Sequence, residues 1–251
     1  MPNPHSILIT GASSGIGEAL ALLYAAPGVR LALTGRNAER VEAVAAACRD
    51  KGAEAEGRVI DVADEAAMFA WIAELDDARP LDLIIANAGV GLSPADAGGL
   101  HAAVKQTFAV NVDGVFNTIH PALERMKKRA GGQIAIVSSI AGFRGMPGAA
   151  PYSASKVAVK GYGQALRGAY WGRVKVNVIC PGFVTTRMTA NNRFPMPFLM
   201  DSPKAARLIA RGLRRNKGVI AFPFPTAFAM RVIECLPAAL SDRILRHSPK
   251  K

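Results

Sequence analysis

The chain has 251 residues and a mass of 26.4 kDa, and half of its residues are hydrophobic, which suits a globular domain with a substantial core and excludes extended disorder. No apolar run reaches the length of about eighteen residues that could span a membrane, and the first residues lack a signal-peptide pattern. Three scattered cysteines and four scattered histidines match neither a disulfide framework nor a metal-ligand spacing. We therefore expect a cytoplasmic protein without a bound metal.

The net charge of +12 is concentrated in the last quarter of the chain. From Arg187 onward the sequence has thirteen lysines and arginines against three acids, whereas the first 186 residues carry eighteen bases and sixteen acids. Such a basic segment favours contact with an anionic partner. Nucleic acid is a poor candidate, because the sequence contains no recognised nucleic-acid-binding module.

Short apolar runs alternate with helical stretches along the chain, as in parallel βα units. Strands are predicted at 6–10, 29–34, 56–60, 81–86, 133–137, 175–179 and 218–222. Helices are predicted at 18–26, 38–51, after the N-cap Asp64, at 104–126 and at 152–171. The pattern predicts an α/β fold with a single domain, in which a doubly wound, Rossmann-type parallel sheet of about seven strands has helices on both faces.

A glycine-rich turn, Thr10-Gly11-Ala12-Ser13-Ser14-Gly15-Ile16-Gly17, joins the first strand to the first helix. Glycines let the backbone turn tightly and approach a phosphate, and the helix behind them offers free N–H groups to the anion. The turn therefore predicts a dinucleotide site, with an ordinary strand–helix turn as the alternative. The candidate cofactor contacts are Gly11, Ser13, Ser14, Gly15, Ile16 and Gly17.

Gly35 and Arg36 follow the second strand, where dinucleotide-binding folds contact the adenosine ribose. A carboxylate at this point would repel a 2′-phosphate, whereas the guanidinium of Arg36 suits one. The residue therefore favours NADP(H) over NAD(H). The alternative is a solvated arginine at the start of a helix.

Ser139, Tyr152 and Lys156 are the residues that indicate chemistry most directly. Tyr152 and Lys156 are four residues apart in a predicted helix, so their side chains share one face. A nearby ammonium stabilises the phenolate, which would lower the tyrosine pKa toward the range of an acid–base catalyst. Ser139 ends the fifth strand at the carboxyl edge of the sheet, where such folds bind ligands. Alone, Y-x-x-x-K is a frequent chance pattern on a helix surface.

Several further motifs make the chain similar to one known family. The glycine-rich turn, Asn87-Ala88-Gly89, Asn111, Ser139, Tyr-Ser-Ala-Ser-Lys at 152–156 and Pro181-Gly182 occur in the order and spacing of the short-chain dehydrogenases/reductases. The resemblance extends from about residue 6 to 188. It implies an NADP(H)-dependent alcohol dehydrogenase or carbonyl reductase, in which the cofactor carries the hydride and the protein aligns the reactants.

The resemblance also implies residue roles. Tyr152 would act as general acid/base, Ser139 would orient the substrate oxygen, and Lys156 would hold the nicotinamide ribose and lower the pKa of the tyrosine. Asn111 would hold a water that links Lys156 to solvent.

By the same resemblance, further cofactor contacts are Asp61 and Val62 at the adenine, Asn87, Ala88 and Gly89 beside the adenosine ribose, Tyr152 and Lys156, and Pro181, Gly182, Val184 and Thr186 at the nicotinamide. Asn87 has an alternative interpretation, in which it only satisfies backbone groups. Many NADP-preferring members carry a basic residue before Gly15, where this chain has Ser14.

The segment 187–216 corresponds to the family's substrate lid and is rich in methionine and phenylalanine, which suits a hydrophobic substrate. The alternative is that these side chains only pack the lid onto the core. The segment 223–251 is a basic amphipathic extension with three interpretations: peripheral membrane contact, docking of an acidic carrier protein, or simple cover for a subunit.

Two other functions compete with the general carbonyl reductase. One is reduction of a 3-oxoacyl group on an acyl carrier protein. The other is a non-catalytic dinucleotide-binding regulator or membrane-surface scaffold, which would have no need of the four residues Asn111, Ser139, Tyr152 and Lys156 together. Relatives commonly pair through the helices found here at 104–126 and 152–171, so the resemblance implies a homo-oligomer, either a dimer or a tetramer.

Overall fold

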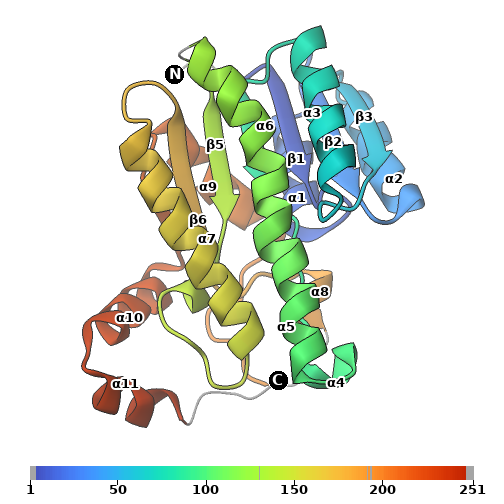
Figure 1. Ribbon diagram of the computed structural model, residues 1–251. Coiled ribbons are helices and arrows are strands. Elements are labelled where there is room, and N and C mark those ends of the chain that lie inside the picture. The colour runs from blue at the N-terminus through green and yellow to red at the C-terminus, as the bar shows by residue number, and fades with distance from the viewer. Residues whose placement is uncertain (1–3, 130, 191, 193, 247–251) are drawn as a thin grey trace.

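Seven strands form one parallel sheet at the centre of the computed structural model, which describes residues 4–129, 131–190, 192 and 194–246 (Figure 1). Their order across the sheet is β3-β2-β1-β4-β5-β6-β7. The strands are β1 (Ser6–Thr10), β2 (Arg30–Gly35), β3 (Glu54–Val59), β4 (Leu83–Ala86), β5 (Gln133–Val137), β6 (Lys175–Pro181) and β7 (Val219–Phe222). The strand order reverses between β1 and β4, which places a ligand crevice at their carboxyl ends.

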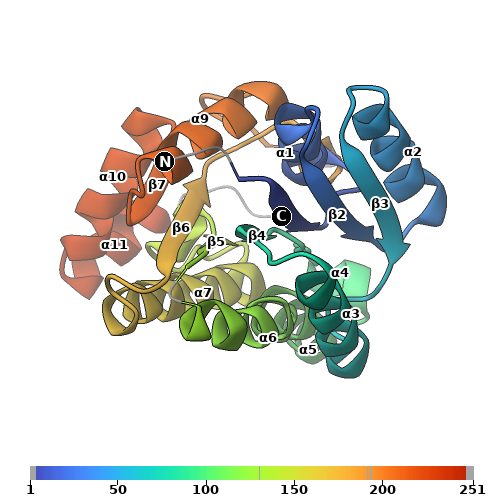
Figure 2. The same cartoon turned by 90° about the horizontal axis from the view of Figure 1, so that it is seen from above.

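Helices cover both faces of the sheet, as Figure 2 shows from above. One face packs against α1 (Gly15–Tyr24), α2 (Ala38–Arg49) and α9 (Ser202–Arg214), and the other against α3 (Glu65–Ala78), α5 (Leu100–Phe108), α6 (Gly114–Lys128) and α7 (Ala150–Ala169). Two single turns, α4 (Pro94–Ala97) and α8 (Arg187–Ala190), lie in loops, and α10 (Phe224–Cys235) and α11 (Ala238–Leu245) follow β7. The predicted single-domain, doubly wound fold is confirmed.

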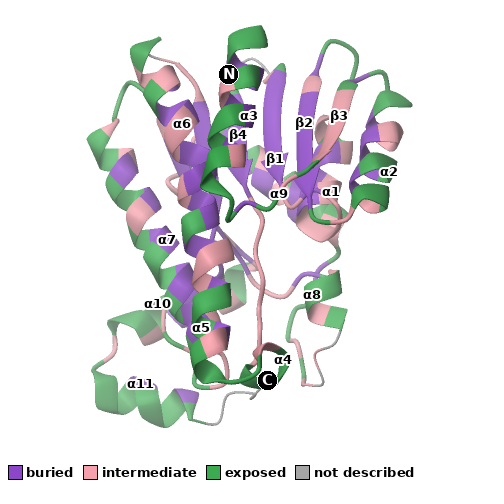
Figure 3. Cartoon of the chain, turned by 45° about the vertical axis from the view of Figure 1, so that its right-hand side comes forward, coloured by how far each residue is buried: buried purple, intermediate pink, exposed green. Residues whose placement is uncertain are grey.

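The central strands are buried on both faces (Figure 3). Within β1, Ile7 and Ile9 lie in the core shared with α1 and α9, whereas Leu8 lies in the opposite core with Trp71 of α3. This alternation follows from the strand geometry, in which successive side chains point to opposite faces. Because both faces are covered, each strand needs a continuous apolar run, which is why the sequence revealed the strands clearly.

The long helix predicted at 104–126 is broken by a different helical geometry. The structure has α5, then a π-helical segment Ala109–Asp113, then α6. A π-helical turn widens the backbone spacing and is common at functional sites, and this one carries Asn111. The sequence-based prediction of one continuous helix did not anticipate this segment, because it is only five residues long and helical on both sides.

The predicted lid range 187–216 combines two different structures. Its second half, α9, packs on α1, and Ala205, Ile209 and Leu213 are buried in the core. In the first half, the described residues 187–190, 192 and 194–200 comprise the short helix α8 and loop segments beside the site. The assignment of that half as a substrate lid stays a prediction.

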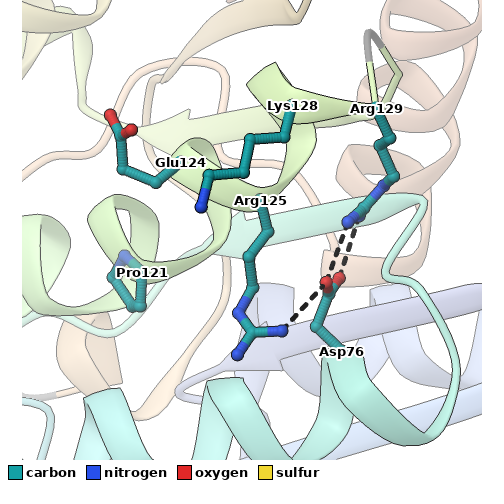
Figure 4. Close-up of a pocket in the computed structure, with 6 residues that line it drawn as sticks. All are labelled: Asp76, Pro121, Glu124, Arg125, Lys128 and Arg129. Atoms are coloured by element: carbon teal, nitrogen blue, oxygen red, sulfur yellow. Dashed lines mark hydrogen bonds and ion pairs between the residues drawn. The ribbon is translucent and has the colours of Figure 1, made fainter.

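An open hollow of about 600 Å³ lies between α3 and α6 and is lined by Asp76, Pro121, Glu124, Arg125, Lys128 and Arg129 (Figure 4). Arg129 donates two hydrogen bonds to the buried Asp76 carboxylate, at 2.8 and 2.9 Å. Asp76 also accepts from the backbone N–H of Leu81 at 2.8 Å, just before β4 begins. The carboxylate therefore joins α3, α6 and the amino end of β4, which is the end opposite to the ligand crevice.

Candidate active site

The glycine-rich turn lies at the carboxyl end of β1, and α1 begins at Gly15. Gly15 has a φ of +63°, and a Cβ at this position would lie 2.8 Å from the Thr186 side chain. A Cβ on Gly17 would collide with the carbonyl oxygen of Gly11. Only glycine fits both positions, so the turn keeps the close backbone approach and the free helix N–H groups that a phosphate requires.

Asn87 joins the end of β4 to this turn. Its Nδ2 donates to the carbonyl oxygens of Thr10 and Gly11 at 2.9 and 3.2 Å. The hydroxyl of Thr10 in turn accepts from the backbone N–H groups of Asn87 and Ala88, both at 3.1 Å. Asn87 therefore satisfies backbone groups and shapes the turn, while its contact with a cofactor stays a prediction.

A hollow of about 290 Å³ brings together Arg36 and Asp61, which follow different strands. Its other lining residues are Ala63, Val90, Leu92, Gln106, Ala109 and Val110. The Asp61 carboxylate accepts from the backbone N–H of Ala63 at 3.0 Å, and Val62 is buried behind it. Arg36 is exposed and has no ion-pair partner among the described residues, so its guanidinium is available to an anion.

Tyr152 and Lys156 lie on consecutive turns of α7. The Nζ of Lys156 is 5.7 Å from the centre of the Tyr152 ring. Lys156 is 3% exposed, and its Nζ donates to the carbonyl oxygen of Val137 at the end of β5, at 3.0 Å. This bond fixes the ammonium between α7 and the carboxyl edge of the sheet.

Two adjacent serines after β5 have different partners. Ser138 donates from its hydroxyl to the backbone carbonyl of Lys156 at 2.7 Å and thereby holds α7 against the sheet. Ser139 caps the short helix η2 (Ile140–Gly142), and its Oγ accepts from the backbone N–H of Ala141 at 3.1 Å. The Ser139 hydroxyl also lowers the pKa of the Tyr152 phenol by hydrogen bonding, so the two side chains lie close together.

Burial dominates the acid–base properties of this group. It raises the pKa of the Tyr152 phenol, and the Ser139 hydroxyl opposes that rise in part. Burial also lowers the pKa of the Lys156 ammonium to about 8, against a smaller raising effect from Cys180. The sequence led us to expect a lowered tyrosine pKa, whereas burial is the largest influence on this phenol and raises its pKa. A phenol with a raised pKa is protonated at neutral pH and can donate a proton.

Asn111 sits in the π-helical segment and is completely buried. Its Oδ1 accepts from the backbone N–H of Val90 at 2.8 Å, and its Nδ2 donates to the Val90 carbonyl at 2.9 Å and to the Ser155 hydroxyl at 3.0 Å. A Cβ on Gly89 would lie 3.2 Å from Asn111 Oδ1 and 3.3 Å from Lys156 Nζ. Gly89 therefore lets the loop after β4 pass between the asparagine and the lysine.

The loop after β6 crosses the same edge of the sheet. The Pro181 carbonyl accepts from the Ser139 hydroxyl at 3.4 Å, and Val184 forms a bridge with Met200. Thr186 lies against Gly15 of the phosphate turn, since a Cβ on that glycine would touch the threonine side chain. The loop therefore spans from Ser139 to the glycine-rich turn, with Gly182 packed against Pro223.

Sequence reasoning missed three supporting residues. Asn117 donates from Nδ2 to the Val62 carbonyl at 3.0 Å, which positions the predicted adenine segment. Ser155 bonds Asn111 and also donates to the Tyr152 carbonyl at 2.7 Å. Thr189 donates to the Val184 carbonyl at 2.7 Å and closes the loop after β6. Asn117 and Ser155 had a detectable signal, because each is a polar residue on the apolar face of a predicted helix.

The described residues contain no cluster of His, Cys, Asp or Glu side chains that could hold a metal ion. In the same described part of the chain, no helix is long and apolar enough to cross a bilayer.

Comparison with known proteins adds independent information. The family model described as "short chain dehydrogenase" matches residues 5–196. A protein of Myxococcus xanthus called "uncharacterized oxidoreductase" is 39% identical over 244 residues, which are 96% of this chain and 96% of that protein.

Solved structures are similar over most of the chain. A short-chain dehydrogenase from Sphingobium yanoikuyae in complex with NADPH has a TM-score of 0.81 and 23% identity, covering 98% of this chain and 96% of that one. A 3-ketoacyl-ACP reductase from Sinorhizobium meliloti has a TM-score of 0.76 and 32% identity, covering 89% and 99%. The first similarity supports the fold, and the second adds sequence similarity across nearly the whole of a solved relative.

Proposed function

Because the chain belongs to the short-chain dehydrogenase family and is an oxidoreductase of that family, we propose that it reduces the carbonyl group of an apolar substrate with NADPH. The observation that carries this proposal is the group formed by Ser139, Tyr152 and Lys156, which lies beside the glycine-rich turn at the carboxyl edge of the sheet. The four residues Asn111, Ser139, Tyr152 and Lys156 would serve no purpose together in a non-catalytic regulator.

The site fits a dinucleotide, because Gly15, Gly17 and Gly89 leave open a path that side chains would fill. The turn would hold the phosphates, and Lys156 would hold the nicotinamide ribose. When bound, the cofactor supplies a hydride to the carbonyl carbon.

The protein residues handle the proton. Tyr152 donates its phenolic proton to the carbonyl oxygen, so the product is an alcohol, and Ser139 hydrogen-bonds the same oxygen to orient it. The tyrosine recovers a proton through Lys156 and a water held at Asn111. The raised pKa of Tyr152 keeps the phenol protonated at neutral pH, so that it can donate a proton to the carbonyl oxygen.

Arg36 supports NADPH over NADH. It lines the hollow at the end of β2 together with Asp61, is exposed, and has no ion-pair partner in the described part of the chain. A guanidinium in this position is suited to a 2′-phosphate. Gly35 cannot be replaced by aspartate or glutamate unless neighbouring atoms move, because a Cβ at this position would lie 2.8 Å from Ser13 Oγ.

The segment between β6 and α9 supports an apolar substrate. Met188, Phe198 and Leu199 are 38%, 60% and 46% exposed at the loop that crosses the site. A flexible methionine and aromatic lining suits a hydrophobic ketone, aldehyde or alcohol. A 3-oxoacyl thioester on an acyl carrier protein is the second candidate, favoured by the similarity to the Sinorhizobium meliloti 3-ketoacyl-ACP reductase.

A homo-oligomer is also proposed, through the outward faces of α6 and α7. A Cβ placed on Gly161 or Gly168 of α7 would have no other atom within 4 Å, so neither glycine serves packing within the subunit. Exposed Ala154 and Ala158 continue this face of small residues. Small side chains let two helices approach closely, which suits contact with a second copy.

The test is NADPH oxidation measured against apolar aldehydes and ketones, small polar sugars and 3-oxoacyl thioesters, with Tyr152→Phe run alongside. We expect turnover of apolar carbonyls that falls by about 10²–10⁴-fold in the variant, while NADPH binding is retained. Preference for sugars would refute the substrate proposal. NADPH binding without turnover of any substrate class would favour the regulator.

A further inference from the structure

The two helices after β7 expose large apolar side chains to solvent. These are Phe224, Phe228 and Val232 of α10 and Leu240 and Ile244 of α11, which are 77%, 58%, 45%, 52% and 50% exposed. The rings of Phe224 and Phe228 stack on each other, with centroids 5.8 Å apart and planes 22° apart. A preformed aromatic pair on the surface is a costly arrangement in water unless something covers it.

These exposed side chains do not lie on the faces of α10 and α11 that pack against the rest of the protein. Ala227 and Met230 provide the buried contacts of α10, and Ser241 and Leu245 those of α11. The exposed residues of α10 are spaced four apart, at 224, 228 and 232, so they form a second apolar stripe on the outer side of the helix. The described part of the chain has nothing packed over this stripe.

Ion pairs leave the same helices with an outward positive charge. The described residues of 223–246 include two acids, and each forms an ion pair with a basic residue from the body of the protein, although the Asp242 side chain itself is 74% exposed. Glu234 pairs with Lys160 of α7 at 2.5 Å, and Asp242 pairs with Arg144 at 3.5 Å. Arg231, Arg243 and Arg246 have no ion-pair partner among the described residues, and all three are exposed. The Arg231 guanidinium also lies 5.6 Å from the centre of the Phe143 ring, so Arg243 and Arg246 contribute most of the outward charge.

The position of these helices relates them to the active site. Figures 1 and 3 both place α8, α10 and α11 at the end of the molecule beyond the carboxyl edge of the sheet. The exposed lid residues Phe198 and Leu199 belong to the loop that crosses this edge. The apolar, basic surface and the entrance to the site are therefore at the same end.

We propose that the surface formed by Phe224, Phe228, Arg231, Val232, Leu240, Arg243, Ile244 and Arg246, here called the α10–α11 surface, docks on an anionic lipid bilayer. Aromatic and aliphatic side chains enter the boundary between headgroups and acyl chains, and the arginines contact lipid phosphates. If the proposed reductase function holds, this contact brings the substrate entrance to the source of apolar carbonyl compounds.

Two other occupants fit less well. A second copy in a two-fold interface would bring three unpaired arginines against the same three arginines, which is repulsive. An acidic protein would match the arginines but gives no reason for a stacked phenylalanine pair that is mostly exposed. For an acidic protein, the stripe of α9 is better suited, because Lys204, Arg207, Arg211 and Arg215 are exposed there and 202–217 contains no acid.

The test is co-sedimentation of the full chain with vesicles of phosphatidylcholine alone or mixed with phosphatidylglycerol. We expect binding to the mixed vesicles, and weaker binding at high salt because screening removes the contribution of the arginines. Phe224→Ser/Phe228→Ser should reduce the partition coefficient by about tenfold or more. Arg231→Gln/Arg243→Gln/Arg246→Gln should reduce it by a similar factor, about tenfold or more.

Two matched controls locate the contact. Trp171→Ser removes an aromatic side chain that is 75% exposed at the opposite end of the molecule, just before β6, and should leave binding unchanged. Arg207→Gln/Arg211→Gln/Arg215→Gln removes the same number of charges from α9 and should also leave most binding intact. Circular dichroism and NADPH affinity of each variant confirm that it is folded.

Three results would overturn the proposal. The first is no binding of the wild-type chain to either kind of vesicle. The second is binding that the α9 variant abolishes while the phenylalanine variant retains it, which would assign the contact to charge on α9. The third is self-association in solution that the phenylalanine variant removes, which would assign the surface to a second copy. None of these measurements depends on turnover, so a failure here is distinct from failure of the reductase proposal.

Discussion

Adjacent residues at the active site have different physical roles, and Ser138 and Ser139 are the clearest example. Both are buried, and they differ by one position at the end of β5. The Ser138 hydroxyl bonds the Lys156 carbonyl and so belongs to the packing of α7, whereas the Ser139 hydroxyl lies close enough to Tyr152 to lower the pKa of its phenol. A sequence alone assigns the catalytic serine by its spacing from the tyrosine, but the structure explains what the other serine does.

Replacing each serine in turn separates these roles. Ser139→Ala should lower kcat by about 10²-fold, because a group that stabilises the developing charge is lost, and should also cost about 1 kcal/mol of stability, because the cap of η2 is lost. Ser138→Ala should lower the free energy of unfolding by about 1 kcal/mol and leave kcat nearly unchanged, because a buried hydrogen bond is lost. Steady-state kinetics and urea unfolding of both variants measure this. Equal losses of kcat would contradict the assignment.

Arg36→Ala tests the cofactor choice at the level of a single side chain. We expect kcat/KM for NADPH to fall by about 10–10²-fold, because a charge-assisted contact with the 2′-phosphate is lost. The value for NADH should change little, since that cofactor has a hydroxyl at the same place. Arg40→Ala, one helical turn away on α2, is the matched control. An equal loss for both cofactors would count against a phosphate contact.

Lys156 gives a prediction for the dependence of stability on pH. Its folded pKa of about 8 lies below the ordinary lysine value of 10.5, so burial of the ammonium opposes folding when the lysine is protonated. That opposition is fully present below pH 8 and is relieved as the pH rises toward 10.5. The stability of the wild type relative to Lys156→Met should therefore increase across this window. Urea unfolding of both proteins at a series of pH values measures the difference, and a flat difference would contradict it.

At the scale of elements, ion-paired carboxylates hold neighbouring helices together. Asp76 receives both Nη atoms of Arg129 and the backbone of Leu81, and thereby ties α3, α6 and β4. Glu234 has a similar function for α10, since it pairs with Lys160, whose ammonium lies 4.4 Å from the centre of the Phe143 ring. Because Lys160 is one turn beyond Lys156, α10 is anchored on the catalytic helix itself.

Asp76 and its neighbour Asp77 allow a buried ion pair to be compared with an exposed one. Both lie near Arg125, but the Asp76 side chain is 4% exposed and that of Asp77 is 66% exposed. Asp76→Asn should lower the free energy of unfolding by about 3 kcal/mol, because two arginines lose their buried partner. Asp77→Asn should cost much less, because solvent screens its ion pair. Urea unfolding measures both changes. Similar losses of unfolding free energy in the two variants would refute the role of the buried Asp76 ion pairs.

At the scale of the whole molecule, the excess positive charge has two separate locations. The basic residues of α9 lie on one helix that packs on α1, whereas those of α10 and α11 lie among exposed phenylalanine, leucine and isoleucine. The outward face of α7, with its small residues, is a third surface. The three surfaces suit different partners, so a single net charge of +12 is a poor guide to any of them.

Gly161→Gln tests the proposed assembly. A side chain at Gly161 meets open space within the subunit, and glutamine is a better helix former than glycine, so the fold should be unharmed. A close contact with a second copy would be blocked. We expect light scattering to give a multiple of 26.4 kDa for the wild type and a lower mass for the variant. Ala43→Gln on the exposed side of α2 is the control, and an unchanged mass for Gly161→Gln would exclude this face.

The sequence by itself determined the fold class and the seven strands, and it predicted the motif residues of the candidate site. Strands buried on both faces must be continuous apolar runs, and a turn that approaches a phosphate must contain glycine at set positions, so both leave a local signal. Only the tertiary structure decided which half of 187–216 is a core helix, where Asn111 widens a helix, and that burial raises the pKa of Tyr152. Those properties depend on which residues from distant parts of the chain pack around a position. The local spacing of residues in the sequence does not show these contacts.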